Sequence, residues 1–260
     1  MINNRLKKFS VLLLVFCSFV FNAALAQTVS IKTQTNVSCN GGTNGSFEVQ
    51  VSGGSPVFRY SIFGGSPYQY SPVFNNLPAA SYVVTVTDTL GGSDTVQVHV
   101  LEPSALILSV ASKTNVTCNG LSDGTVNLSS NGGTAGYSYK AGSGTYQSSN
   151  AFINVNPGTT IFSVLDVNGC IDTQYVVITE PTALNLSLVK SDVTCNGLGN
   201  ASITSSGSGG LIPYLYSLNG GTYQTSNSFS ALSAGTYTVT IKDINGCTYN
   251  KSVIIPNPHL

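Results

Sequence analysis

The chain repeats one short pattern three times, and this self-similarity constrains the fold more than any other feature. Each copy begins with a Val-Ser/Thr-Cys-Asn-Gly segment, and successive segments lie 79 and 77 residues apart. Their cysteines are Cys39, Cys118 and Cys195. Self-similarity at a fixed period is the signature of an array built from one small unit. We therefore expect three consecutive repeats and no single large domain that houses an active site.

A second landmark follows near the end of each copy. Asp166–Cys170 and Asp243–Cys247 both read Asp-x-Asn-Gly-Cys, whereas the corresponding segment Asp88–Gly92 keeps the aspartate and ends in glycine. Asn-Gly favours the positive φ angles that a type I′ turn requires. The Asp-x-Asn-Gly-Cys segments therefore predict a β-hairpin with a type I′ turn in the second and third repeats, and Asp88–Gly92 is a decayed copy of that turn in the first.

The residues between the landmarks predict short strands. In the third copy Tyr237, Val239 and Ile241 alternate with threonines, which is the period of two typical of a half-buried strand. About seven such strands per copy, with turn signals every 8–12 residues, favour an all-β fold: a tandem array of three small immunoglobulin-like or Greek-key β-sandwiches. The expected repeats are 27–103, 104–181 and 182–258, with prolines at the seams.

The amino terminus predicts export. A basic start is followed by an apolar run over 9–21 and by the small-residue sequence Ala24-Leu25-Ala26. This pattern predicts a cleaved signal peptide at 1–26 and a mature chain that begins at Gln27. We expect no transmembrane segment in the mature chain, because no second apolar run is long enough to span a bilayer.

Cysteine spacing predicts disulfides inside repeats. In both the second and the third repeat, the second cysteine lies 52 residues after the first. Identical spacing favours one disulfide per repeat in an oxidising compartment. The expected pairs are Cys118 with Cys170 and Cys195 with Cys247. Cys39 has no expected mate, because Gly92 stands at its partner's place. Cys39 is then either a buried thiol or a point of intermolecular pairing or attachment.

The order of these motifs resembles the SprB-type repeat of surface proteins from gliding and related Bacteroidota. The resemblance covers nearly all of residues 28–258 and is best in the third repeat, through Val193–Gly197, Ala234–Tyr237 and Asp243–Cys247. The first repeat departs from the pattern by losing its second cysteine. The resemblance implies an adhesin-like protein that is secreted or held on the bacterial cell surface, outside the outer membrane, and exported by the type 9 route.

Composition argues against several function classes. Charged residues make up 8% of the chain and the formal net charge is zero, which lacks the basic footprint of nucleic-acid binding. No recognised catalytic motif occurs in a suitable context, so we expect neither an enzyme nor a cofactor. No metal site is expected, because there is no CxxC pair and the Asp-Gly segments lack most of the oxygen ligands that calcium needs.

Three functional interpretations remain. The first is a non-catalytic stalk or display array at the cell surface. The second is a module that binds an extracellular polysaccharide or protein through one specialised repeat. The tyrosines could form a sugar-stacking face, although they recur in every repeat at strand period, which favours core packing. The third is a self-assembling fibre subunit that associates through strand edges or Cys39. Separately, Asp88-Thr89-Leu90 and Asp94-Thr95-Val96 look like O-glycosylation sites of that phylum, at Thr89 and Thr95.

Overall fold

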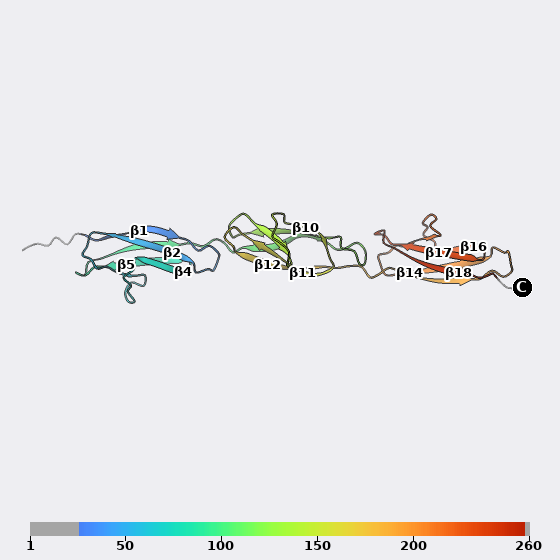
Figure 1. The fold of residues 1–260 in the computed structure, drawn as a ribbon, viewed down its shortest axis with the longest axis horizontal. Coiled ribbons are helices and arrows are strands. Elements are labelled where there is room, and N and C mark those ends of the chain that lie inside the picture. The colour runs from blue at the N-terminus through green and yellow to red at the C-terminus, as the bar shows by residue number, and fades with distance from the viewer. Residues whose placement is uncertain (1–25, 258–260) are drawn as a thin grey trace, which may run out of the picture. The chain divides into compact units, whose positions relative to one another are not determined.

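The computed structural model describes residues 26–257, so almost all of the expected signal peptide lies outside the described residues. Every regular element in this range is a β-strand, and all strand pairs are antiparallel (Figure 1). Within this range no helix is long or apolar enough to cross a membrane. The chain is therefore all-β, as its alternating pattern predicts.

Each repeat contributes six strands in two three-stranded sheets. In the first repeat one sheet has the order β1-β2-β4 and the other has the order β3-β5-β6. The bounds are β1 (Thr28–Thr35), β2 (Gly45–Ser52), β3 (Arg59–Ser61), β4 (Val73–Leu77), β5 (Ala80–Thr87) and β6 (Ser93–Val100).

The second and third repeats have the same arrangement, with sheets β7-β8-β10 and β9-β11-β12, then β13-β14-β16 and β15-β17-β18. In the second repeat the strands are β7 (Ile107–Thr114), β8 (Gly124–Asn131), β9 (Ser138–Ala141), β10 (Ala151–Val155), β11 (Gly158–Leu165) and β12 (Ile171–Ile178). In the third they are β13 (Asn185–Ser191), β14 (Ala201–Ser208), β15 (Leu215–Leu218), β16 (Ser228–Leu232), β17 (Gly235–Lys242) and β18 (Thr248–Ile255).

This strand order is immunoglobulin-like. Constant-type immunoglobulin domains place strands A, B, E and D in one sheet and C, F and G in the other. In chain order each repeat supplies strands equivalent to A, B, C, E, F and G, and it pairs them as A-B-E and C-F-G. Strand D is absent, which explains why each repeat has six strands where about seven were expected.

The described chain divides into two compact units. One contains the described residues up to Val37 together with Thr43–Leu101, and the other contains Ser38–Gly42 together with the described residues from Glu102 onward. The short segment Ser38–Gly42 lies within the first repeat by sequence but belongs to the second unit.

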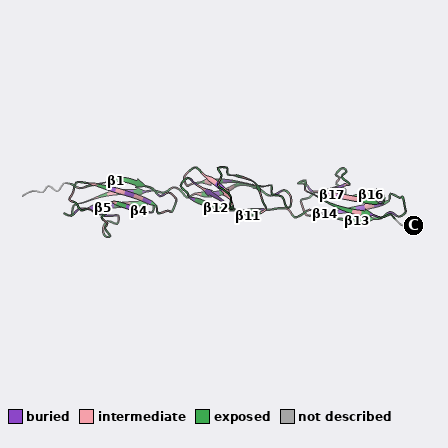
Figure 2. Cartoon of the chain, viewed as in Figure 1, coloured by how far each residue is buried: buried purple, intermediate pink, exposed green. Residues whose placement is uncertain are grey.

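Each repeat has its own apolar core between its two sheets. Figure 2 colours the buried residues of the strands purple. The cores centre on fully buried residues such as Phe47, Phe162 and Ile241. Three tyrosines occupy equivalent places in the three repeats and are each only 7% exposed: Tyr60, Tyr139 and Tyr216. Core packing is therefore the correct interpretation of these tyrosines, and sugar stacking by them is excluded.

The expected hairpins are present, but the prediction of a type I′ turn is wrong. The hairpin of β11 and β12 is closed by a hydrogen bond from the Gly169 amide to the Asp166 carbonyl, at 3.1 Å. Gly169 has a φ of 85°, whereas Asn168 is not among the residues with positive φ. A type I′ turn needs positive φ at both central residues, while a type I turn followed by a left-handed glycine closes a three-residue loop. The glycine therefore follows the turn.

A tyrosine corner supports the crossing between the sheets in two of the three repeats. The hydroxyl of Tyr237, near the start of β17, donates to the carbonyl of Ser233 at 3.0 Å, and that of Tyr82 in β5 donates to Pro78 at 2.8 Å. This Tyr at the start of strand F is a hallmark of immunoglobulin-type sandwiches. The second repeat has Thr160 in the equivalent place.

We predict that Tyr237→Phe lowers the free energy of unfolding of the third repeat by about 1 kcal/mol, because one intramolecular hydrogen bond is lost while the ring remains. Chemical denaturation followed by circular dichroism measures the change. Tyr223→Phe is the matched control, since that ring lies at the surface under the Lys242 ammonium, and we expect it to change stability by less than about 0.5 kcal/mol. Equal effects of the two substitutions would contradict the structural role of the corner.

Candidate functional site

The cysteines pair across the repeat pattern and not within it. Disulfides join Cys39 to Cys170 and Cys118 to Cys247, and Cys195 is free and exposed. The expected pairs Cys118–Cys170 and Cys195–Cys247 are therefore wrong, and so is the expectation that Cys39 is unpaired. Because Cys39 is already bonded, it is not available for attachment or self-association.

The expected pairs fail because the two cysteines of one repeat lie at opposite ends of its strand G, which is β12 in the second repeat. In the second repeat the Val116 amide donates to Thr179, just after β12, so the Cys-Asn-Gly loop lies at the carboxyl end of that strand. Cys170 directly precedes the other end of β12. An eight-residue strand is roughly 25 Å long, whereas bridged cysteines have Cα atoms within about 7 Å of each other. Two cysteines of one sandwich therefore cannot meet.

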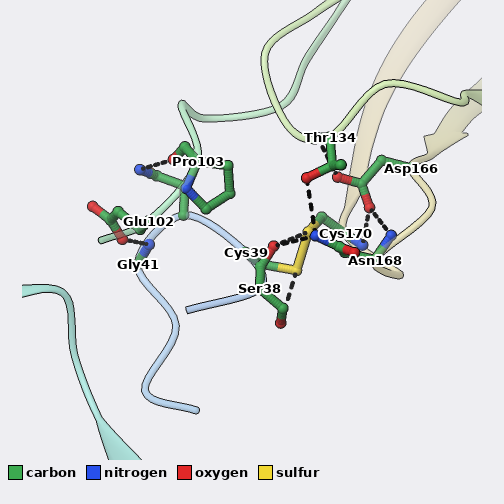
Figure 3. The surroundings of a disulfide bond; sticks show 10 residues. Ser38, Cys39, Gly41, Glu102, Pro103, Thr134, Asp166, Asn168 and Cys170 are labelled. Carbon is green, nitrogen blue, oxygen red and sulfur yellow. Dashed lines mark hydrogen bonds between the residues drawn. A yellow bond between two sulfur atoms is a disulfide. The ribbon is translucent and has the colours of Figure 1, made fainter. Parts of the chain in front are cut away.

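Figure 3 shows the surroundings of the Cys39–Cys170 disulfide, all of which belong to the second unit. The two Cα atoms are 5.6 Å apart. The side-chain amide of Asn168 donates to the carbonyl of Ser38 at 3.2 Å and to the hydroxyl of Thr134 at 2.9 Å. The Sγ atom of Cys170 lies 3.4 Å from the same Ser38 carbonyl. The turn thus holds the loop by a covalent bond and by a hydrogen bond.

The second junction repeats this geometry. Cys118 and Cys247 have Cα atoms 5.7 Å apart. The Asn245 amide donates to the Thr117 carbonyl at 2.9 Å, and the Sγ atom of Cys247 lies 3.4 Å from that oxygen. In both junctions the Asn and the Cys of the Asp-x-Asn-Gly-Cys motif contact the loop of the preceding repeat, the Asn by a hydrogen bond and the Cys by a disulfide.

The Cys-Asn-Gly loops are held by the proline seams. Gly120 donates its amide to the Glu180 carboxylate at 2.8 Å, and the Asn119 side chain donates to the Pro181 carbonyl at 3.1 Å. The first loop has the same two bonds, from Gly41 to Glu102 at 2.6 Å and from Asn40 to Pro103 at 3.1 Å (Figure 3). Gly120 has a φ of 77°, a conformation that favours glycine. The Glu-Pro pairs at the two seams, Glu102-Pro103 and Glu180-Pro181, thus shape these loops.

In each turn a buried aspartate accepts hydrogen bonds from backbone amides. Asp166 is 3% exposed; one carboxylate oxygen accepts the amides of Asn168 and Cys170 at 2.9 Å, and the other accepts the amide of Thr134 at 2.8 Å. Asp88 and Asp243 have equivalent contacts with Ser55 and Leu211. Since backbone amides point at both carboxylate oxygens, these residues act as turn anchors. They are not calcium ligands.

The same contacts shift the acidity of two of these groups. Burial raises the pKa of Asp166, but the amides of Thr134, Cys170 and Asn168 together outweigh it and leave the pKa below its usual value. The pKa of Asp88 is also lowered, chiefly by the amide of Ser55. Both carboxylates are therefore ionised in the folded protein at neutral pH.

The remaining candidate residues are at the surface of the first repeat. Thr89 and Thr95 are both exposed, and the Thr89 hydroxyl donates to the carbonyl of Pro56 at 3.2 Å. Their O-glycosylation stays a prediction. Within residues 26–257, no group of three or more His, Cys, Asp or Glu side chains could hold a metal ion.

Comparison with known proteins agrees with the threefold pattern. The family model described as the SprB repeat matches residues 31–67, 110–146 and 187–223. No curated protein matches the chain. Among solved structures, the chain is similar to three N-terminal domains of the highly immunogenic outer capsid protein of bacteriophage RB49, at 15% identity and a TM-score of 0.41, over 89% of this chain and 96% of that one.

Two adhesion proteins show a similar degree of likeness. Invasin, a bacterial integrin-binding protein, has 15% identity and a TM-score of 0.33 over 88% of this chain and 60% of that one. The first eight immunoglobulin domains of Down syndrome cell adhesion molecule have 11% identity and a TM-score of 0.38, over 89% of this chain and 36% of that one.

We predict that Asp166→Asn lowers the free energy of unfolding at neutral pH by about 1–3 kcal/mol, because the new amide group faces buried backbone donors. Asp192→Asn is the control, since Asp192 is half-exposed and forms only a surface ion pair with Lys190; we expect less than about 0.5 kcal/mol. Thermal denaturation of both variants measures the difference.

The acid dependence has a defined direction. A carboxyl with a lowered pKa in the folded state stabilises the protein above its unfolded pKa of about 3.9 and loses this contribution as pH falls through the folded value. The unfolding temperature should therefore drop below about pH 4, and less steeply in Asp166→Asn. An equal acid slope in the variant and the parent would contradict the anchoring role of Asp166.

Proposed function

Because this chain is an array of three SprB repeats, we propose that it is a non-catalytic protein, secreted or held on the bacterial cell surface outside the outer membrane, that serves as a stalk or display array. The observation that carries the proposal is the pair of disulfides between Cys-Asn-Gly loops and Asp turns of following repeats. Disulfides persist in oxidising compartments outside the cytosol, which supports the exported location.

The covalent network suits a protein under tension. The Cys39–Cys170 and Cys118–Cys247 bonds enclose overlapping stretches of chain, of 131 and 129 residues. Between the two bonds the chain therefore runs three times, over 39–118, 118–170 and 170–247. A pulling force applied at both ends is shared among three parallel stretches, and the shortest of them sets the limit of extension.

This limit can be expressed as a length. With both bonds intact, the shortest covalent path from residue 27 to residue 257 contains about 75 residues, which extends to at most roughly 260 Å. With both bonds reduced, the path contains about 230 residues and extends to roughly 800 Å. Such a stalk cannot be drawn out fully even when all three β-sandwiches unfold.

We predict that single-molecule stretching of the mature chain yields a final contour length under oxidising conditions about one third of that after reduction. Replacing one bond at a time, with Cys39→Ser plus Cys170→Ser or with Cys118→Ser plus Cys247→Ser, should give a path of about 100 residues, roughly 350 Å. Cys195→Ser is the matched control and should behave as the parent. A contour length that does not depend on reductant would contradict the mechanical role.

A specific surface favours a second function, binding of a polysaccharide by the first repeat. A depression of about 640 Å³ is lined by Val57, Arg59, Tyr70, Asp88, Thr89, Leu90 and Gly91. Tyr70 is 71% exposed and Leu90 is 75% exposed, so both side chains are accessible to a ligand in this depression. The Tyr70 ring and the Arg59 guanidinium line the same depression, where they offer an apolar face and polar donors to a sugar ring. The volume of the depression lies within the usual range of ligand sites.

We predict that, if the first repeat binds glycans, Tyr70→Ala reduces binding of the full chain to a panel of bacterial and host polysaccharides at least tenfold. Tyr175→Ala is the control, because Tyr175 is a similarly exposed tyrosine, at 65%, in β12. Glycan arrays and calorimetry measure both. Absence of saturable binding by the parent, or equal loss in both variants, would leave the stalk interpretation and remove this one.

A further inference from the structure

The free cysteine of the third repeat occupies the position that is bonded in both other repeats. Cys39 and Cys118 each bond to a cysteine at the end of an Asp-x-Asn-Gly-Cys turn. Cys195 follows the same Val-Thr/Ser sequence and precedes the same Asn-Gly pair, but it is free and exposed. Two equivalent positions in the same molecule thus show what this position bonds to.

The loop around Cys195 is already in the shape that the bonded loops have. The amide of Leu198 donates to the Cys195 carbonyl at 3.2 Å, as that of Leu121 donates to Cys118 at 3.1 Å. Gly197 has a φ of 80°, close to the 77° of Gly120. Val193, like Val116, is anchored in the core at 5% and 4% exposure. The loop is therefore preformed before any partner binds.

The first repeat cannot supply that partner. Its turn keeps the aspartate anchor, since Asp88 accepts the Gly92 amide at 2.7 Å. The two residues that hold a neighbouring loop elsewhere are both replaced: Leu90 stands where Asn168 and Asn245 donate to the loop, and Gly92 stands where Cys170 and Cys247 form the bond. A second copy of this chain therefore offers no receiving cysteine through its first repeat, and Cys170 and Cys247 are already bonded.

We propose that Cys195 is a linkage site for a further SprB-type module that carries an intact Asp-x-Asn-Gly-Cys turn and is not a copy of any repeat of this chain. The partner's cysteine thiol and the Cys195 thiol form one disulfide. The two protons and two electrons pass to a disulfide oxidant, such as glutathione disulfide or an oxidised dithiol oxidoreductase, which is reduced to two thiols. The partner's turn asparagine donates to the carbonyl of Thr194.

The inference does not depend on adhesion or on a mechanical role, since it concerns only which surface Cys195 recognises. Its test rebuilds the missing partner in the first repeat. Leu90→Asn plus Gly92→Cys converts Asp88–Gly92 into an Asp-x-Asn-Gly-Cys turn. The nearest atoms to a side chain at position 92 are those of the Asp88 carboxylate. The equivalent aspartates, Asp166 and Asp243, accept the amides of Cys170 and Cys247 in the same way. The altered turn therefore matches two that the fold already accommodates.

The experiment mixes two full-length mature chains in a glutathione redox buffer. The donor is the parent chain, and the acceptor carries Leu90→Asn, Gly92→Cys and Cys195→Ser. We expect a disulfide heterodimer that joins position 195 to position 92, formed at least tenfold faster than with an acceptor that carries Ser93→Cys and Cys195→Ser. Ser93 is an exposed neighbour outside the motif position. Peptide mapping by mass spectrometry identifies the bond.

Several outcomes would overturn the proposal. Equal rates with the two acceptors would show that Cys195 reacts as an ordinary exposed thiol, and so would a product dominated by symmetric Cys195–Cys195 dimers. If the triple variant has a lowered unfolding temperature, the acceptor with only Gly92→Cys and Cys195→Ser replaces it under the same criterion. In the native source, non-reducing electrophoresis distinguishes the two origins of the module: a bond within one polypeptide leaves the mass unchanged, whereas a bond to another chain increases it.

Discussion

The hydrogen bonds from backbone amides to the buried aspartate of each F–G turn hold both the sandwich and its junction in shape. The aspartate carboxylate accepts amides from its own turn and from the connection between strands B and C, so it joins the two sheets of a sandwich at one point. The same contacts fix the backbone of the turn that presents Asn168 and Cys170, or Asn245 and Cys247, outward. One internal anchor thus stabilises the repeat and prepares its junction.

The periodicity of the sequence was sufficient to predict the architecture. Alternating residues such as Val239 and Ile241 are fully buried, and the hairpin of β17 and β18 lies where the pattern places it. These features are local, since each follows from the preferences of a few neighbouring residues. The threefold repetition adds confirmation, because a local pattern that recurs three times is not accidental.

The disulfide pairing could not be predicted from spacing, because spacing does not say at which end of a sandwich a loop lies. Cys118 and Cys170 keep a constant separation since both occupy fixed places in the repeat, and that is equally true of residues at opposite ends. The decisive facts are the bonds of Val116 to Thr179 and of Leu108 to Asp172, which place strands A and G side by side. They became visible only in three dimensions. The prediction of a type I′ turn was wrong because Asn-Gly also suits a type I turn followed by a left-handed glycine.

Direct determination of the disulfide pairing in the native, unreduced protein tests the central claim most directly. Free thiols are first blocked at low pH, the chain is digested without reductant, and cross-linked peptides are sequenced by mass spectrometry. We expect peptides that join Cys39 to Cys170 and Cys118 to Cys247. Peptides that join Cys118 to Cys170 or Cys195 to Cys247 would contradict it, because the disulfides would then close the second and third repeats and would not link one repeat to the next.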